Sequence, residues 1–127
     1  MRRRRRTGQA MLVAAGLLNL LPGVGLVAPG RASAAYGVDI AGADLETLMR
    51  HRALLLALVG GLAVLAAFRP RLRAAAIAVN AVSFGSFTVI ALVTPAVNTE
   101  LTRVAWADVA GLLVLSCGAV LLGREDT

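Results

Sequence analysis

Four long apolar runs dominate the pattern of hydrophobic and polar positions along the chain. They cover residues 11–28, 53–68, 74–93 and 104–122. Each run has about the length of a membrane-spanning helix, which needs roughly 20 apolar residues. Prolines lie between the runs, and proline ends a helix because it lacks a backbone N–H. The pattern therefore predicts an all-α fold, an integral membrane four-helix bundle in which residues 1–127 form a single domain.

The connection before the second run has a helical pattern of its own. The spacing i, i+3, i+4, i+7 is filled by Leu45, Leu48, Met49 and Arg52, which is typical of one face of an α-helix. We therefore expect an amphipathic helix over about 44–52, with the Asp44 carboxylate as its N-cap. Because the same stripe continues into the second run, Arg52 faces apolar surroundings, where a charge is costly unless it is paired or reaches the interface.

Other polar side chains are expected at the same end of the bundle as Arg52, and Asp108 lies one turn into the fourth run. The predicted polar layer consists of Arg52, Asp108, Arg103, His51, Glu100 and Asp39. One interpretation of this layer is a binding site for a small anion, a polar headgroup or a proton. The other is a set of salt bridges that fixes the helix register, with long arginines reaching the interface. We favour the structural interpretation, in which Asp108 pairs with Arg52.

Polar and small residues also occur inside the apolar runs. Asn19, Asn80 and Ser83 are of the kind that form hydrogen bonds between membrane helices. Pairs of small residues four positions apart, such as Ala57 and Gly61, allow helix backbones to approach closely. These features are ordinary for a packed bundle and predict helix–helix contacts.

Composition and missing motifs narrow the function. The chain of 127 residues is 58% hydrophobic and 16% charged, with a mean hydropathy of +0.78, whereas a soluble domain is about 45–50% apolar and about 25% charged. A single cysteine, Cys117, and a single histidine, His51, exclude a cluster of such ligands around a metal within one chain. Phosphate-binding and hydrolase motifs are missing too. We therefore expect no enzyme activity and no cofactor.

The placement of arginines predicts the orientation. One side of a four-span bundle carries the arginines at 2–6 together with Arg69, Arg71, Arg73 and Arg124, and the other side carries Arg31, Arg50, Arg52 and Arg103. Because arginine accumulates on the cytoplasmic side, we expect both termini inside the cell, in a multi-pass protein of the bacterial inner (plasma) membrane. The arginines at 2–6 lack neighbouring aromatic residues, so we expect them to contact the lipid bilayer and no nucleic acid.

The first run has a second interpretation as a signal peptide, cleaved after Ala34 in the motif A-S-A. The apolar stretch is longer than the usual signal-peptide core of about 7–15 residues. Pro22 and Gly23 also interrupt it in its middle. We favour a retained membrane helix, while a cleaved leader stays the alternative.

Several motifs resemble a family of small bacterial four-helix membrane proteins. They are L-L-N-L-L-P-G-V-G-L in the first run, Y-G-V-D at 36–39, L-M-R-H-R-A-L-L-L at 48–56, A-F-R-P at 67–70 and N-T-E-L-T-R-V-A-W-A-D at 98–108. Some members carry the name phosphopantetheine adenylyltransferase, but that activity needs an H-x-G-H-type nucleotide motif, which this chain lacks. The resemblance implies no established activity and marks Arg50, His51 and Arg52 as the family's most recognisable motif.

Two functional classes remain open. The first, which we favour, is a structural or accessory protein that packs against a larger membrane-protein partner or forms a homo-oligomer. The second is a small transporter or a binding protein for a lipophilic molecule, such as a lipid or a quinone, with the polar layer as its site. Small multidrug exporters also have four helices, but the acidic residue that they need in the first span is missing here.

Overall fold

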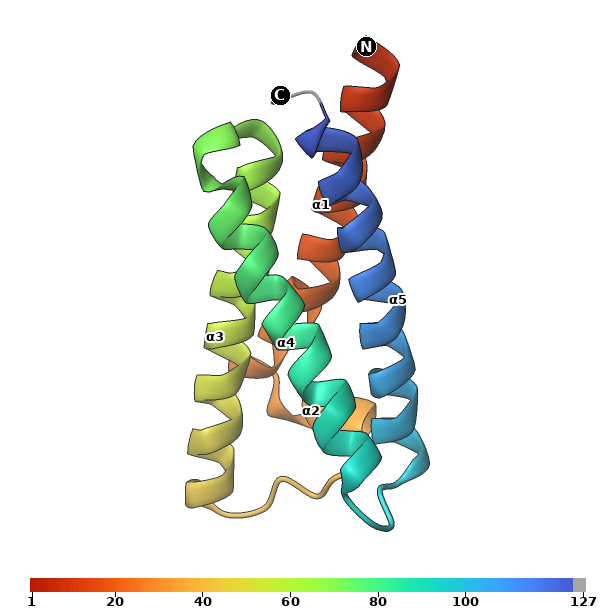
Figure 1. The fold of residues 1–127 in the computed structure, drawn as a ribbon. Helices are drawn as coiled ribbons and strands as arrows, with labels where there is room; N and C mark the ends of the chain where they lie inside the picture. Colours follow the sequence, from red (N-terminus) through yellow and green to blue (C-terminus); the bar gives the residue numbers. More distant parts are fainter. Residues whose placement is uncertain (125–127) are drawn as a thin grey trace.

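The computed structural model describes residues 1–124 and shows a bundle of long helices (Figure 1). The elements in chain order are α1 (Arg2–Leu20), the 3₁₀ helix η1 (Leu21–Leu26), α2 (Pro29–Tyr36), α3 (Ala43–Phe68), the 3₁₀ helix η2 (Pro70–Leu72), α4 (Arg73–Val93) and α5 (Thr99–Gly123). The described residues contain no strand. The predicted all-α class is therefore confirmed.

Four segments are long and apolar enough to cross a membrane: Arg2–Leu26, Ala43–Phe68, Pro70–Val93 and Thr99–Gly123. Large apolar side chains are exposed along them, including Leu58, Val82 and Leu113. Such an outer surface is stable in lipid and would be costly in water. The chain is therefore a multi-pass membrane protein, as the hydrophobic pattern predicted.

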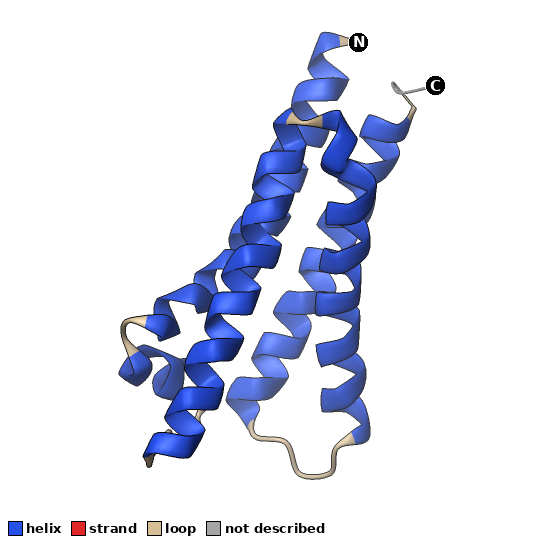
Figure 2. Cartoon of the chain, turned by 90° about the vertical axis from the view of Figure 1, so that its left-hand side faces the viewer, coloured by secondary structure: helices blue, strands red, loops and turns tan. Residues whose placement is uncertain are grey.

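The four spans form a ring in which neighbours run in opposite directions. α1 packs against α3 and α5, and α4 completes the ring by packing against the same two helices. This is the up-down-up-down arrangement of simple four-helix bundles. Both chain ends lie at one end of the bundle, together with the turn between α3 and α4 (Figure 1). At the other end, the short η1–α2 segment folds out to one side (Figure 2).

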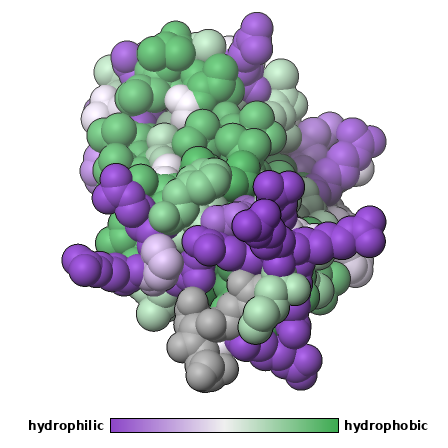
Figure 3. Space-filling view, turned by 90° about the horizontal axis from the view of Figure 1, so that it is seen from above, coloured by the Kyte–Doolittle hydropathy of each residue, from purple (hydrophilic) through white to green (hydrophobic). Residues whose placement is uncertain are grey.

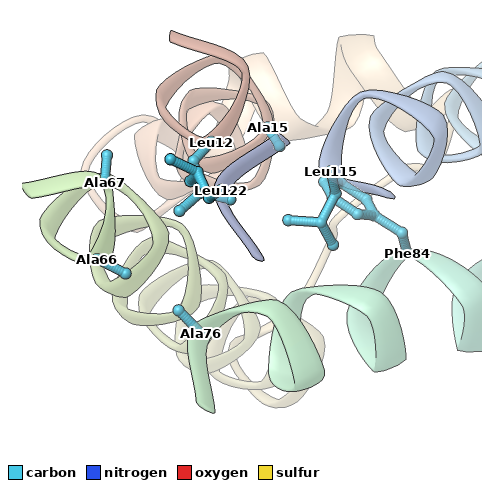
Figure 4. Close-up of a cluster of buried hydrophobic side chains, with 8 residues drawn as sticks. All are labelled: Leu12, Ala15, Ala66, Ala67, Ala76, Phe84, Leu115 and Leu122. Carbon is cyan, nitrogen blue, oxygen red and sulfur yellow. The ribbon is translucent and has the colours of Figure 1, made fainter. Parts of the chain in front are cut away.

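The core of the bundle combines alanines with larger leucine and phenylalanine side chains (Figure 4). Its buried residues are Leu12, Ala15, Ala66, Ala67, Ala76, Phe84, Leu115 and Leu122. α1 and α3 approach most tightly where Gly16 faces Gly60, since a Cβ added to Gly60 would meet the backbone oxygen of Gly16 and lie 2.6 Å from the Leu20 nitrogen. Close contact between small residues is how membrane helices gain packing energy.

The start of α3 differs from the sequence prediction. The segment 44–52 and the second run belong to one continuous helix, which begins at Ala43 after Gly42. Gly42 has a φ of 90°, a value that favours glycine. Asp44 therefore lies inside the first turn and makes no side-chain cap. Its negative charge still stabilises the helix because it lies near the positive end of the helix dipole.

Candidate functional site

Pro22 breaks the first span and opens the bundle at the end away from the termini. α1 stops at Leu20, and the chain continues as the six-residue 3₁₀ helix η1 with Pro22 in its first turn. Pro29 then starts α2, where a missing N–H costs nothing. The first apolar run is thus a helix that turns aside before its end. This break makes room for α2 beside the bundle.

Two contacts hold the end of α2 in place. Gly37 ends the helix with a φ of 60°, and a Cβ there would lie 2.7 Å from Oε2 of Glu100. Asn98 caps α5 by accepting a hydrogen bond from the Leu101 N–H over 2.7 Å. Its Nδ2 donates to the carbonyl oxygens of Tyr36 and Gly37 at 3.0 and 3.1 Å. Asn98 therefore fastens α2 to the start of α5.

The last residue of α2, Tyr36, is buried and contacts Arg52 of α3. Nη1 of Arg52 donates a hydrogen bond of 2.8 Å to the Tyr36 hydroxyl. The Arg52 Cζ lies 4.9 Å from the centre of the Tyr36 ring and 5.7 Å from that of Phe87. Aromatic faces attract a guanidinium, and the attraction grows when water is excluded. Helical spacing correctly predicted that Arg52 turns inward, and the structure adds that it is held by aromatic rings.

Arg52 and Asp108 line the same cavity, which has a volume of about 260 Å³. Its other polar lining residues are Tyr36, Asn19, Ser83 and Ser86. Asp108 is half-buried and feels the opposite charge of Arg52. In the part of the chain that the structure describes, no direct ion pair joins the two, and no hydrogen bond reaches the Asp108 carboxylate. The two charged side chains thus line one cavity without forming a salt bridge across it. The sequence led us to expect a direct ion pair.

A second, more apolar cavity of about 210 Å³ adjoins the first. The two share Leu18, Pro22, Tyr36, Val104 and Asp108 as lining residues. Most of the remaining lining residues are apolar and come from η1 and α2, and Arg31 is the charged residue among them. A polar chamber therefore lies directly beside an apolar one.

A buried hydrogen-bond network lies beneath the polar cavity. Asn19 donates from Nδ2 to Oδ1 of Asn80 over 2.8 Å and accepts from the Ser83 hydroxyl over 3.2 Å. Asn80 in turn donates to the carbonyl oxygens of Val59 and Ala76 at 3.0 and 2.8 Å. The network joins α1, α3 and α4, which confirms the expected hydrogen bonds between helices. It holds the lower wall of the cavity rigid because every bond is within the protein.

The rest of the predicted polar layer lies elsewhere. Arg103, His51 and Asp39 are exposed, and Glu100 packs at the end of α2 beside Gly37. None of these side chains belongs to the lining of either cavity. The structure therefore brings together Arg52 and Asp108 and adds Tyr36, Ser86 and Phe87, which the sequence did not assign to this layer. In the sequence, Tyr36 is the single tyrosine of the chain and the first residue of the motif Y-G-V-D, but no spacing rule places it beside Arg52.

The polar groups that line the site are two charged side chains together with hydroxyl and amide groups. Among residues 1–124, no three histidine, cysteine, aspartate or glutamate side chains lie close enough together to hold a metal ion. Comparison with known protein families, curated proteins and solved structures finds no match to the chain. The resemblance carried by the sequence motifs therefore stays a prediction, and function must be argued from the cavity.

Proposed function

We propose that the chain is a non-enzymatic binding protein of the bacterial inner membrane that holds a small lipophilic molecule by its polar group. The observation that carries this proposal is the pair of opposite charges, Arg52 and Asp108, that line one cavity without contacting each other directly. A purely structural pair would gain more by closing into a salt bridge, because unpaired charges in an apolar bundle are costly. The polar group of a bound molecule between them would remove this cost.

The adjoining apolar cavity supports a lipophilic partner. Arg52 and Asp108 each lie nine residues after the first residue of their helix. That places them about 14 Å along the helix axis, at a rise of 1.5 Å per residue. A molecule that reaches this depth comes most easily from the lipid phase, and its apolar part would fill the space lined by Leu18, Pro22 and Val104.

The orientation and the partners belong to the same proposal. With both termini in the cytoplasm, as the arginine distribution predicts, the cavity lies toward the outer face of the inner membrane. The accessory role that we favoured from the sequence becomes secondary, because a structural bundle has no need of a cavity with two separated charges. Assembly with a larger partner or as a homo-oligomer stays a prediction.

The proposal is tested by identifying the small molecules that stay bound to the protein during purification. The chain is purified from membranes in mild detergent, and the small molecules that remain bound are extracted and compared with bulk membrane lipid by mass spectrometry. We expect one class of lipophilic molecule to be enriched, and Arg52→Gln to lower its amount roughly tenfold, since a hydrogen bond to a charged group contributes about 1.5–3 kcal/mol. Arg103→Gln, which removes an exposed arginine outside the cavity, should leave the amount unchanged. Equal loss in both variants, or no enrichment in the unmodified protein, would overturn the proposal.

A further inference from the structure

A third hollow lies at the opposite end of the bundle, on the outer face between α1 and the end of α3. This α1–α3 groove has a volume of about 480 Å³. It is lined by Arg6, Gln9, Ala10, Val13, Ala14, Leu17 and Phe68. It shares no residue with the Arg52–Asp108 cavity, so whatever occupies it is independent of the proposed function.

The groove is polar at one end and apolar along the rest. Arg6 stands at the end near the chain terminus, and Ala10, Ala14 and Leu17 follow along exposed positions of α1. Gln9 forms part of the wall, since its Nε2 donates to the carbonyl oxygen of Ala67 over 3.0 Å and joins α1 to α3. The small side chains of Ala10 and Ala14 are what hollow the surface at this place.

The length of the groove matches one leaflet of a membrane. From Arg6 to Leu17 the axis of α1 rises by about 16 Å, at 1.5 Å per residue. One half of a hydrocarbon core of about 30 Å has nearly the same thickness. A lipid chain that runs from the interface to the middle of the bilayer would therefore fill the groove and place its headgroup at Arg6.

The positive charge at this end of the bundle favours a lipid with an anionic headgroup. Figure 3 views the molecule from this end and shows hydrophilic side chains spread around the apolar surface. The arginines at 2–6, Arg69 and Arg71 lie at this end of the bundle, and Arg73 lies there as a buried side chain. The acidic side chains among residues 1–124 are Asp39, Asp44, Glu46, Glu100 and Asp108, all in the half of the bundle away from the termini. Clustered arginines beside a span attract anionic lipid headgroups.

We propose that the α1–α3 groove is a binding site for an anionic phospholipid, with one acyl chain along Ala10, Ala14 and Leu17 and the phosphate at Arg6. The site differs from general attraction to the membrane surface in one respect. It requires Arg6 and the groove itself, and it does not require the neighbouring Arg5, which does not line the groove.

The test is native mass spectrometry of the delipidated full chain with dioleoyl-phosphatidylglycerol or dioleoyl-phosphatidylcholine added at equal concentration. We expect a preference for phosphatidylglycerol. Arg6→Gln should reduce the fraction with bound phosphatidylglycerol about fivefold, which corresponds to the contribution of one arginine near an anionic lipid. Arg5→Gln, an exposed neighbour that does not line the groove, should change it by less than about twofold.

A second pair of variants tests the acyl chain. Ala14→Leu fills the groove at an exposed position and should lower phosphatidylglycerol binding to a similar extent. Ala78→Leu makes the same change on the exposed face of α4 and should leave binding intact. Glycerol 3-phosphate, the soluble headgroup part, should not compete. Equal effects of Arg5→Gln and Arg6→Gln, no effect of Ala14→Leu, or full competition by glycerol 3-phosphate would each overturn the proposal.

Discussion

The hydroxyl of Tyr36 accepts a hydrogen bond of 2.8 Å from Nη1 of Arg52. This bond fixes the position of the arginine that lines the polar cavity together with Asp108. Tyr36 belongs to α2, which exists as a separate helix because Pro22 and Pro29 interrupt the first span. Arg52 belongs to α3. The contact therefore links the break in the first span to the charge that defines the cavity.

Removing the Tyr36 hydroxyl should weaken the fold near α2. Tyr36→Phe keeps the ring that faces the Arg52 guanidinium but leaves the guanidinium without this acceptor. We expect the free energy of unfolding to fall by about 1–2 kcal/mol. A hydrogen bond to a charged group contributes more than one between neutral groups, whereas hydrogen bonds between membrane helices contribute less than model peptides suggest. Unfolding in mixed detergent micelles measures this change. Trp106→Phe, at a side chain that is 69% exposed, serves as the control, and an equal change in both variants would contradict the role of the hydroxyl.

The effects of removing the Arg52 charge and the Asp108 charge should not be additive, because the two side chains line the same cavity. Arg52→Gln and Asp108→Asn each leave one charge without an opposite charge in the same cavity, so each should lower the amount of folded protein in the membrane. The double variant makes the cavity neutral and should recover part of that loss, since the cost of an isolated charge is removed with the charge. Abundance is measured by quantitative immunoblotting of isolated membranes. Single-variant losses that simply add in the double variant would show that the charges act independently.

The contact between α1 and α3 makes a prediction for two adjacent glycines. Gly60→Ala would press a methyl group against the Gly16 carbonyl oxygen and the Leu20 backbone, so the helices must separate at a cost of about 1–3 kcal/mol. Gly61→Ala meets Leu20 Cδ1 only at 4.0 Å and should be neutral or stabilising by up to about 1 kcal/mol, because alanine favours a helix. Steric-trap or detergent unfolding compares the two. The reverse order of stabilities would contradict the packing.

The orientation of the spans can be measured with reporter fusions. Alkaline phosphatase joined after Arg124 should be inactive, because arginine-rich segments remain in the cytoplasm and this enzyme needs an oxidising compartment for its disulfides. The same reporter joined after Asn98, between α4 and α5, should be active. The opposite pattern would place the termini outside and would turn the cavity toward the cytoplasm.

Much of the fold follows from hydrophobic spacing, whereas the site depends on contacts that spacing does not describe. The helical periodicity correctly predicted that Arg52 faces the interior of the bundle. The polar residues inside the apolar runs correctly indicated hydrogen bonds between helices, such as the one between Asn19 and Asn80. Periodicity names the face of a helix but not the element that covers it. The contact of Tyr36 with Arg52 depends on how α2 folds back after Pro22, which is a property of a turn and its tertiary contacts.

Small residues illustrate the same limit. Spacing selected Gly61 as a partner of Ala57, but the close approach occurs at the adjacent Gly60, against Gly16. Both glycines fit a small-residue pattern in a chain rich in such residues, and only the crossing point of α1 and α3 distinguishes them. That crossing point is set by the whole bundle. For the same reason Asp108 could be assigned to the level of Arg52 from the sequence, but the cavity between their side chains could not.

An experimental structure determined in lipid, from protein purified under mild conditions, tests the binding proposal most directly. We predict density for a non-protein molecule whose polar group lies between Arg52 and Asp108 and whose apolar part extends into the space beside Leu18, Pro22 and Val104. A cavity closed by a direct salt bridge between Arg52 and Asp108, with the apolar space filled by protein side chains, would contradict it.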